Sequence, residues 1–198
     1  MVIHLRTAAK RSLLILLLLA LAAAGIFGVR LATEHFFRSY YPLKFENEIR
    51  QYAAREEIDP NMLFALVKTE SDFRPDATSR VGARGLCQIM NDTFEWIRGK
   101  LGDPACEFDE MYIPDINIRY GAYLLGTLYR EFGSYEVALA AYHAGRGAVS
   151  KWLGDDRYSP DGKTLERIPI DDTGHYVDKV LKAYSRYESL YPNPDRKD

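Results

Sequence analysis

The stretch TESDFRPDATSRVGARGLCQIM, residues 69–90, joins the end of an apolar helical run to a loop that contains glycine. The run before it, NMLFALVK, is apolar enough to form a core helix, and it ends at Glu70. Gly82 and Gly85 follow in the loop, where glycine lets the backbone come close to a ligand. The stretch therefore predicts one carboxylate at the end of a buried helix, facing a loop that can approach a polar molecule.

Glu70 has the properties expected of a general acid. Because its helix is strongly apolar, we expect the helix end to pack into the core, and burial raises the pKa of a carboxyl group. The last turn of a helix is also the negative end of its dipole, which disfavours ionisation. A carboxyl group that is still protonated near neutral pH can give a proton to a leaving group. The alternative is a helix, a turn and a second helix with an incidental glutamate.

Two polar neighbours complete this predicted site. Ser71 stands next to Glu70 and is predicted to supply a hydrogen bond to it. Gln88 carries both a donor and an acceptor for a polar substrate, because its side chain is an amide.

Helical patterns fill the chain beyond Pro42 and predict one all-α domain over residues 45–190. Asp59 followed by Pro60 predicts a helix start, since an N-cap acceptor precedes proline at the first helical position. Asp92 and Glu95 have the spacing of a capping box that would open another helix. The segment KTLERIPI, residues 163–170, is the best candidate for a strand, and it is short. Further helices are expected at residues 115–132, 135–144, 148–153 and 173–190.

Residues 13–29, LLILLLLALAAAGIFGV, form an unbroken apolar run near the N-terminus. At a rise of about 1.5 Å per residue the run spans roughly 26 Å, which is just long enough for a bilayer core. A cleaved signal peptide, with small residues at positions 22–24 as its cleavage site, is the alternative. The run continues past Ala24, which favours an uncleaved transmembrane anchor.

The flanking charges predict the orientation of this anchor. Lys10 and Arg11 precede the apolar run, and basic residues prefer the cytoplasmic side. We therefore expect a short cytoplasmic segment at residues 1–12, and a single-pass cell-membrane protein whose catalytic domain is extracytoplasmic. Residues 30–44 are predicted to be a juxtamembrane stalk, and residues 191–198 a tail.

Composition argues against several other classes of protein. The net charge of the chain is −2. The charged residues of the first 35 contribute +3, so the remainder carries −5 and nothing indicates nucleic-acid binding. The four histidines are scattered and no spacing is typical of a metal site, so we expect neither a metal nor a cofactor. Cys87 and Cys106 either pair in an oxidising compartment or, in the case of Cys87, form part of the core.

Four blocks of the sequence, in order, resemble the lytic transglycosylases of the soluble (SLT), goose-lysozyme-like type. The blocks are ESDF with GARGLCQIM from Glu70, NIRYGAYLL from Asn117, ALAAYHAG from Ala138 and DTGHYVDKV from Asp172. The resemblance covers about residues 45–190. It implies a lysozyme-like helical catalytic domain that cleaves the bond between N-acetylmuramic acid (MurNAc) and N-acetylglucosamine (GlcNAc) in the glycan strands of peptidoglycan.

The resemblance also implies roles for individual residues. Glu70 would protonate the leaving oxygen and then act as base on the muramic acid 6-hydroxyl, which gives a 1,6-anhydro product. The substrate's acetamido group would replace the usual second carboxylate, an exception to the two-carboxylate rule. Ser71 would orient Glu70, Gln88 would contact the sugar, and Tyr142 and Tyr176 would line or brace the acid.

Departures from the family pattern and other functions remain open at this point. His143 stands where the family usually has asparagine, so it is expected to bind substrate or support the acid, and Cys87 replaces a methionine. A lysozyme-type hydrolase would use the same acid with water as the attacking group. A glycan-binding envelope module without catalytic activity is the alternative from a different class of protein.

Overall fold

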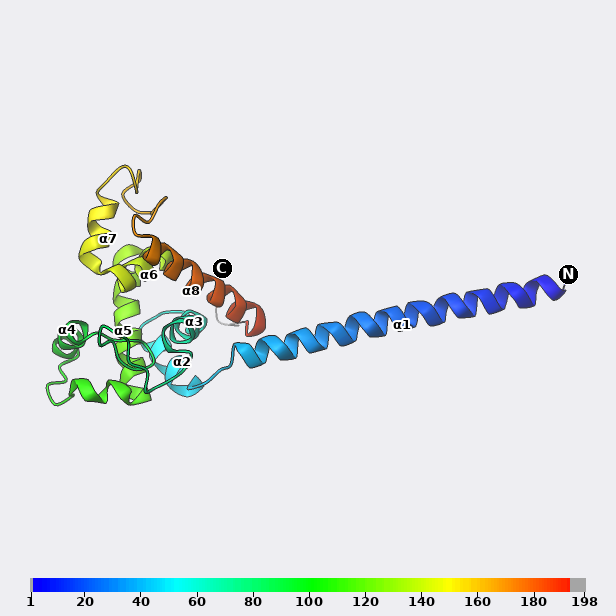
Figure 1. The fold of residues 1–198 in the computed structure, drawn as a ribbon, viewed down its shortest axis with the longest axis horizontal. Coiled ribbons are helices and arrows are strands. Elements are labelled where there is room, and N and C mark those ends of the chain that lie inside the picture. The colour runs from blue at the N-terminus through cyan, green and yellow to red at the C-terminus, as the bar shows by residue number, and fades with distance from the viewer. Residues whose placement is uncertain (1, 193–198) are drawn as a thin grey trace. The chain divides into compact units, whose positions relative to one another are not determined.

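The computed structural model describes residues 2–192, and it divides the chain into two units, residues 1–42 and 43–198. Figure 1 shows the helices along the ribbon. In chain order they are α1 (Val2–Tyr40), α2 (Glu46–Arg55), α3 (Pro60–Ser71), α4 (Asn91–Leu101), the 3₁₀ helix η1 (Phe108–Tyr112), α5 (Pro114–Phe132), α6 (Tyr135–Ala144), α7 (Arg146–Leu153) and α8 (Asp171–Leu190).

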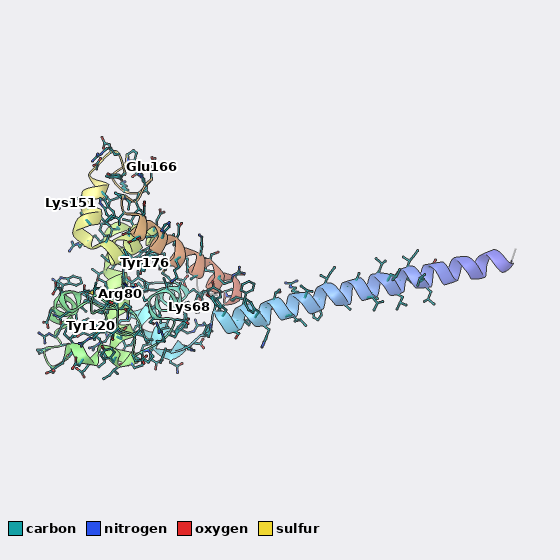
Figure 2. All side chains as sticks on the ribbon, in the orientation of Figure 1. Lys68, Arg80, Tyr120, Lys151, Glu166 and Tyr176 are labelled. Atoms are coloured by element: carbon teal, nitrogen blue, oxygen red, sulfur yellow. The ribbon has the colours of Figure 1, made fainter. Side chains whose placement is uncertain are left out.

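The first unit is the single helix α1. Its segment Ser12–Tyr40 is long and apolar enough to cross a membrane, with a mean hydropathy of 2.7 in its most apolar window. Large side chains such as Leu13 and Ile26 are exposed along it. Figure 2 shows side chains standing out from the ribbon of this helix. A signal sequence near an N-terminus would pass the same test of length and composition. The helix continues through much of the predicted stalk, and a Glu34–Arg38 ion pair of 3.0 Å links successive turns there.

The second unit is helical, as the sequence predicts. Within residues 43–192 the structure contains no strand, and the candidate strand at residues 163–170 consists of bends and irregular backbone. The loop between α3 and α4 holds two isolated antiparallel bridges, Thr78 with Arg84 and Arg84 with Ile89. These bridges fold the loop back on itself, and the Leu86 carbonyl oxygen lies 2.9 Å from the Ser71 hydroxyl at the end of α3.

Helix α3 is the centre of the second unit. Its start is the predicted one, because the Asp59 side chain accepts a hydrogen bond of 2.8 Å from the backbone N–H of Asn61, and Pro60 is the first helical residue. Every residue from Asn61 to Val67 is buried. A helix that is apolar on all sides needs neighbours on all sides, and α3 packs most extensively against α8 and also contacts α2.

The predicted capping box at the start of α4 is wrong. The helix begins at Asn91 with Met90 as its N-cap, and no side chain caps it. Asp92 lies inside the first turn, where the helix dipole favours a carboxylate, and Glu95 instead pairs with Arg98 at 2.5 Å. The N-cap is therefore Met90, two residues before the Asp92 that the pattern indicated.

The remaining helices enclose the core from the other side. Helix α5 packs against α2 and α6, and α6 also packs against α8. Because α6 is rich in alanine, it comes close to both neighbours with little side-chain volume between them. The C-terminal end of α6 and the N-terminal end of α8 thus approach the end of α3, where Glu70 lies.

Candidate active site

Glu70 lies in the last turn of α3, and one of its carboxyl oxygens has a partner on α8. The Tyr176 hydroxyl donates a hydrogen bond of 2.6 Å to Glu70 Oε1. Removal from water raises the pKa of Glu70 to about 7, while the Tyr176 hydrogen bond and the charge of Lys179 act in the opposite direction. A large fraction of this carboxyl group therefore carries a proton at neutral pH.

Ser71 does not form the predicted hydrogen bond with Glu70. Its hydroxyl lies 2.9 Å from the carbonyl oxygen of Leu86 and 3.2 Å from that of Val67. The side chain is buried, so it points into the protein and away from any substrate. Ser71 thus attaches the loop to the end of α3. This role is structural, because its hydroxyl bonds to the backbone and not to Glu70.

Gln88 lies in the loop that faces the end of α3. Its amide nitrogen donates to the carbonyl oxygens of Gly85 at 2.9 Å and Ala77 at 3.2 Å. Its backbone has a φ of 49°, a region that non-glycine residues adopt rarely. The amide nitrogen is thus engaged by the loop, and the side-chain oxygen is the atom that Gln88 can offer to a ligand.

Asn117, on α5, holds this loop in place. Its side-chain oxygen accepts a 2.7 Å hydrogen bond from the Cys87 backbone N–H, and its nitrogen donates to the carbonyl oxygens of Arg84 and Met111. The side chain is fully buried. Asn117 begins one of the four sequence blocks that resemble the family, but the sequence alone did not indicate a role for it. A polar residue on the apolar face of an amphipathic helix was the available signal.

Tyr142, on α6, also contacts this loop. Its hydroxyl donates a 2.7 Å hydrogen bond to the Cys87 carbonyl oxygen, and burial raises the pKa of Tyr142. Cys87 is buried, as expected of a core residue, and both Cys87 and Cys106 are free thiols. The disulfide that the sequence left open is therefore absent from the described part of the chain.

His143 and Tyr176 form a stacked pair. Their ring centroids are 4.5 Å apart with an angle of 29° between the planes. Nδ1 of His143 also lies 3.0 Å from the Thr173 hydroxyl at the start of α8. The structure thus brings Glu70, Tyr176 and His143 into one chain of contacts, with Tyr142 and Gln88 on the loop side.

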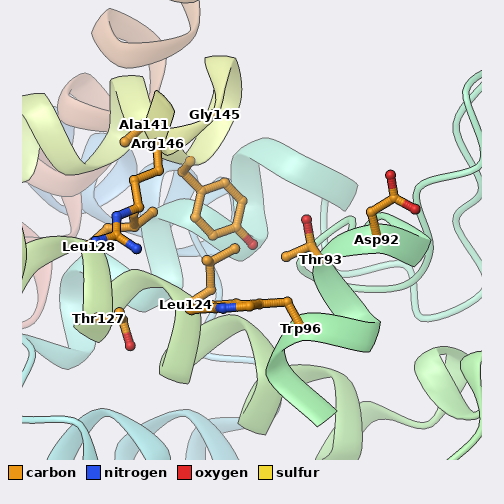
Figure 3. A pocket seen from close by; sticks show the side chains of 10 residues that line it. Asp92, Thr93, Trp96, Leu124, Thr127, Leu128, Ala141, Gly145 and Arg146 are labelled. Atoms are coloured by element: carbon orange, nitrogen blue, oxygen red, sulfur yellow. The ribbon is translucent and has the colours of Figure 1, made fainter. Parts of the chain in front are cut away.

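A cavity of about 340 Å³ adjoins Tyr142. Figure 3 shows residues that line it. The indole of Trp96 and the side chain of Leu124 form much of its apolar wall, while Asp92 and Arg146 lie at different edges. Sequence reasoning did not assign Trp96 or Asp92 to a site. The complete lining is Asp92, Thr93, Trp96, Leu124, Thr127, Leu128, Ala141, Tyr142, Gly145 and Arg146.

No second carboxylate joins Glu70 among the described residues. Among the described residues, the charged side chain that acts on the pKa of Glu70 is Lys179, which lowers it. Asp72 is the next acid along the chain, but it is exposed and pairs with Lys68. Among the described residues the site therefore offers a single proton-transfer group, Glu70, together with the loop that faces it and the cavity lined by Tyr142.

Comparison with known proteins agrees with this geometry. The chain is 34% identical over 152 residues to the soluble lytic murein transglycosylase of Escherichia coli (strain K12), an alignment that covers 74% of this chain and 24% of that protein. It is 30% identical over 173 residues to membrane-bound lytic murein transglycosylase C of Yersinia pestis (strain Pestoides F), with 75% of this chain and 46% of the relative covered. The chain thus spans about a quarter to a half of the length of these relatives.

The fold matches a solved structure of the same kind. The 70 kDa soluble lytic transglycosylase from Escherichia coli superposes with a TM-score of 0.72 at 29% identity, over 79% of this chain and 26% of that one. The lysozyme-like helical fold expected from the sequence is thereby confirmed. The family model described as the transglycosylase SLT domain matches residues 47–164, which is more than half of the chain. The chain therefore belongs to the transglycosylase SLT domain family.

Proposed function

We propose that this chain is a membrane-anchored lytic transglycosylase that cleaves the MurNAc–GlcNAc bond of peptidoglycan glycan strands. The observation that carries the proposal is the single carboxyl group of Glu70, whose pKa is raised to about 7 by burial and whose Oε1 is held by Tyr176. Such a group is protonated often enough at neutral pH to act as an acid and ionised often enough to act as a base. The names of the relatives from E. coli and Yersinia pestis support murein as the substrate.

The two carboxyl oxygens of Glu70 have different parts in this reaction. Because Tyr176 donates to Oε1, the proton of the neutral acid resides on Oε2, from which it passes to the oxygen of the leaving sugar. The resulting carboxylate then takes the proton of the muramic acid 6-hydroxyl as that oxygen attacks the anomeric carbon. The C–O bond to the leaving sugar breaks, an intramolecular C–O bond forms, and Glu70 regains its proton. The product ends in a 1,6-anhydro ring, and water is not consumed.

The positive charge that develops on the sugar ring has no carboxylate partner in the described site. An enzyme with a single acid relies on the substrate's own acetamido group for this stabilisation, as some glycosidase families do. MurNAc carries such a group beside its anomeric carbon. The single-acid arrangement thus favours an N-acetylated substrate over an unsubstituted glycan.

The cavity beside Tyr142 is the proposed binding place for part of the glycan. Flat aromatic and aliphatic side chains, here Trp96 and Leu124, suit the apolar face of a sugar ring. Gln88, in the loop, keeps its side-chain oxygen for a hydroxyl or amide N–H of the substrate. A glycan strand that contacts both the cavity and Gln88 would then pass Glu70.

Helix α1 is proposed as the membrane anchor, with the catalytic unit on the extracytoplasmic side. The apolar segment Ser12–Tyr40 is long enough to cross a bilayer, and Lys10 and Arg11 precede it on the side expected to face the cytoplasm. The relative from Yersinia pestis is itself described as membrane-bound. Peptidoglycan lies outside the cytoplasm, so the proposed location and the proposed substrate agree.

Mass spectrometry of the products tests the proposed reaction. Full-length protein in detergent is incubated with purified peptidoglycan, and the released muropeptides are weighed. Products that end in anhydro-muramic acid, lighter by one water than those of lysozyme, support the transglycosylase. Reducing-end products would identify a hydrolase instead. Glycan binding without any released product, by a protein that unfolds cooperatively, would identify a binding module.

A further inference from the structure

His143 lies in the last turn of α6, and its exposed ring is held at two points by α8. One face stacks on the Tyr176 ring at 4.5 Å between centroids. Its Nδ1 lies 3.0 Å from the hydroxyl of Thr173, a buried residue in the first turn of α8. An exposed side chain keeps most of its rotamer freedom unless specific contacts restrict it. The stacking on Tyr176 and the contact with Thr173 therefore determine the position of the imidazole.

We propose that His143 is a positioning residue, whose ring keeps the hydroxyl of Tyr176 on Glu70. The position of a phenol hydroxyl depends on two side-chain torsions, and a ring stacked on its face restricts both. The inference rests on the proposed function, because it concerns what holds the same acid. His143 acts on Glu70 through Tyr176, whose hydroxyl makes the 2.6 Å contact with the carboxyl group.

The identity of residue 143 separates two possible roles. The ALAAYHAG block has histidine where the similar family block usually has asparagine. Asparagine offers polar atoms to Thr173 or to a substrate, but it has no aromatic face to lay on Tyr176. A role in stacking therefore requires a ring at this position, whereas a role in polar contact is served equally by an amide.

Loosening Tyr176 has a predictable effect on the acid. A hydrogen bond donated to a carboxylate favours its charged form, and Tyr176 accordingly lowers the pKa of Glu70 while burial raises it. The other titratable groups that face Glu70 are Lys179 from α8, Tyr142 from α6 and Cys87 from the loop. We expect these three groups to stay in place when residue 143 changes. The pKa of Glu70 should therefore rise when the stacking ring is lost.

The experiment compares His143→Asn with His143→Phe in the full-length protein in detergent micelles. The pKa of Glu70 is measured by carbon-13 NMR of carboxyl-labelled glutamate, with Glu70→Gln as the assignment control, so the reading does not need turnover. We expect His143→Asn to raise the pKa of Glu70 by about half a unit. It should lower kcat about three- to tenfold and leave KM within about twofold, since an aromatic contact of this kind is modest in strength. His143→Phe restores a ring. It should recover most of the lost kcat and return the pKa of Glu70 most of the way to its value in the natural protein.

His175→Asn is the matched control, because His175 is exposed and directly precedes Tyr176 on the same helix. It should leave the pKa of Glu70 and kcat as they are in the natural protein. If His143→Asn behaves like the natural protein while His143→Phe is impaired, His143 works by polar contact and the proposal is overturned. The proposal is also overturned if His143→Asn, His143→Phe and His175→Asn all have the same Glu70 pKa and the same kcat.

Two further measurements keep the result decisive. Should His143→Asn fail to unfold cooperatively, Thr173→Val loosens the same imidazole at its other contact. That variant should move the pKa of Glu70 in the same direction, and an unchanged value would overturn the proposal. Should the natural protein release no products, the proposed function fails, while the carboxyl pKa values still decide whether His143 positions Tyr176.

Discussion

The Tyr176 hydroxyl and Glu70 Oε1 are 2.6 Å apart although 106 positions separate the two residues in the chain. This contact joins the end of the buried helix α3 to the first turns of α8. It makes the two oxygens of the Glu70 carboxyl group inequivalent. Oε1 accepts the hydrogen bond from Tyr176, and Oε2 is left to carry the proton. The first three predictions follow from it.

Replacement of Glu70 by glutamine should abolish turnover and leave glycan binding in place. Glutamine keeps the shape of the side chain but neither gives nor takes the proton. General acid–base catalysis contributes about 10²–10⁴-fold for each role. Glu70 has two roles in succession in the proposed reaction, so the loss should reach or exceed the top of that range. Release of muropeptides measures it. Asp72→Asn is the control and should retain activity, whereas substantial turnover by Glu70→Gln would show that another group is the acid.

The rate should depend on pH through the same carboxyl group. The free enzyme must hold the proton on Glu70, whose pKa is about 7, so kcat/KM should fall as pH rises above about 7. Tyr176 lowers that pKa, so Tyr176→Phe should move the alkaline limb to higher pH even though its maximal rate is reduced. A pH–rate profile from pH 5 to 9 measures the limb. A shift to lower pH in Tyr176→Phe would contradict the assigned hydrogen bond.

Glu70→Gln should also stabilise the folded protein, and more so at high pH. The folded protein keeps this proton up to about pH 7, whereas the ordinary pKa of a glutamate is 4.5. The folded state therefore binds more protons between these values, and its stability falls as pH rises through that window. Above pH 7 the variant should exceed the natural protein by about 1–3 kcal/mol in free energy of unfolding. Urea titrations at pH 4 and pH 8 measure the difference, which should nearly vanish at the lower pH.

Two glycines of the same loop should respond differently to alanine. Both have positive φ, 74° at Gly85 and 86° at Gly82. A side-chain carbon on Gly85 would overlap the Met111 carbonyl oxygen and the Asn117 side chain, whereas one on Gly82 would meet open space. Gly85→Ala should therefore destabilise by about 3 kcal/mol or more, and Gly82→Ala by about 1 kcal/mol from backbone strain alone. Chemical unfolding of both variants tests this, and equal losses would contradict the packing around Gly85.

The N-terminal apolar run should remain attached to the mature protein. It continues past the small residues at positions 22–24, and α1 is helical to Tyr40. Intact-mass measurement of the protein purified from membranes should give the full chain, and washing with alkaline carbonate should not release it. A mature N-terminus at Gly25 would show that the run is a cleaved signal and would leave the extracytoplasmic location unchanged.

Local signals in the sequence were sufficient for most of the helices. The start of α3 follows from Asp59 and Pro60 because both act within one turn. The start of α4 was misplaced because Asp92 and Glu95 have the spacing of a capping box, while Glu95 finds a better partner in Arg98. Spacing gives the opportunity for a hydrogen bond, and competition among nearby partners decides which bond forms.

The candidate site was harder to predict in its details because its contacts are long-range. Ser71 was expected to bond to its neighbour Glu70, but the carbonyl of Leu86 comes within 2.9 Å once the loop folds back. Asn117 was missed because its three partners belong to segments that meet only in the folded chain. The raised pKa of Glu70 could be expected from the sequence, because burial of its helix could be read from the neighbouring residues.

The complete burial of Asn61–Val67 has a consequence for how activity is lost. Amide hydrogens of a helix enclosed on every side exchange with solvent mainly when the whole domain opens. Glu70 stands one helical turn beyond this enclosed segment, so its position is set by the most protected backbone of the catalytic unit. Inactivation by heat or denaturant should then coincide with the cooperative loss of helicity, without an earlier phase in which a folded but inactive enzyme accumulates.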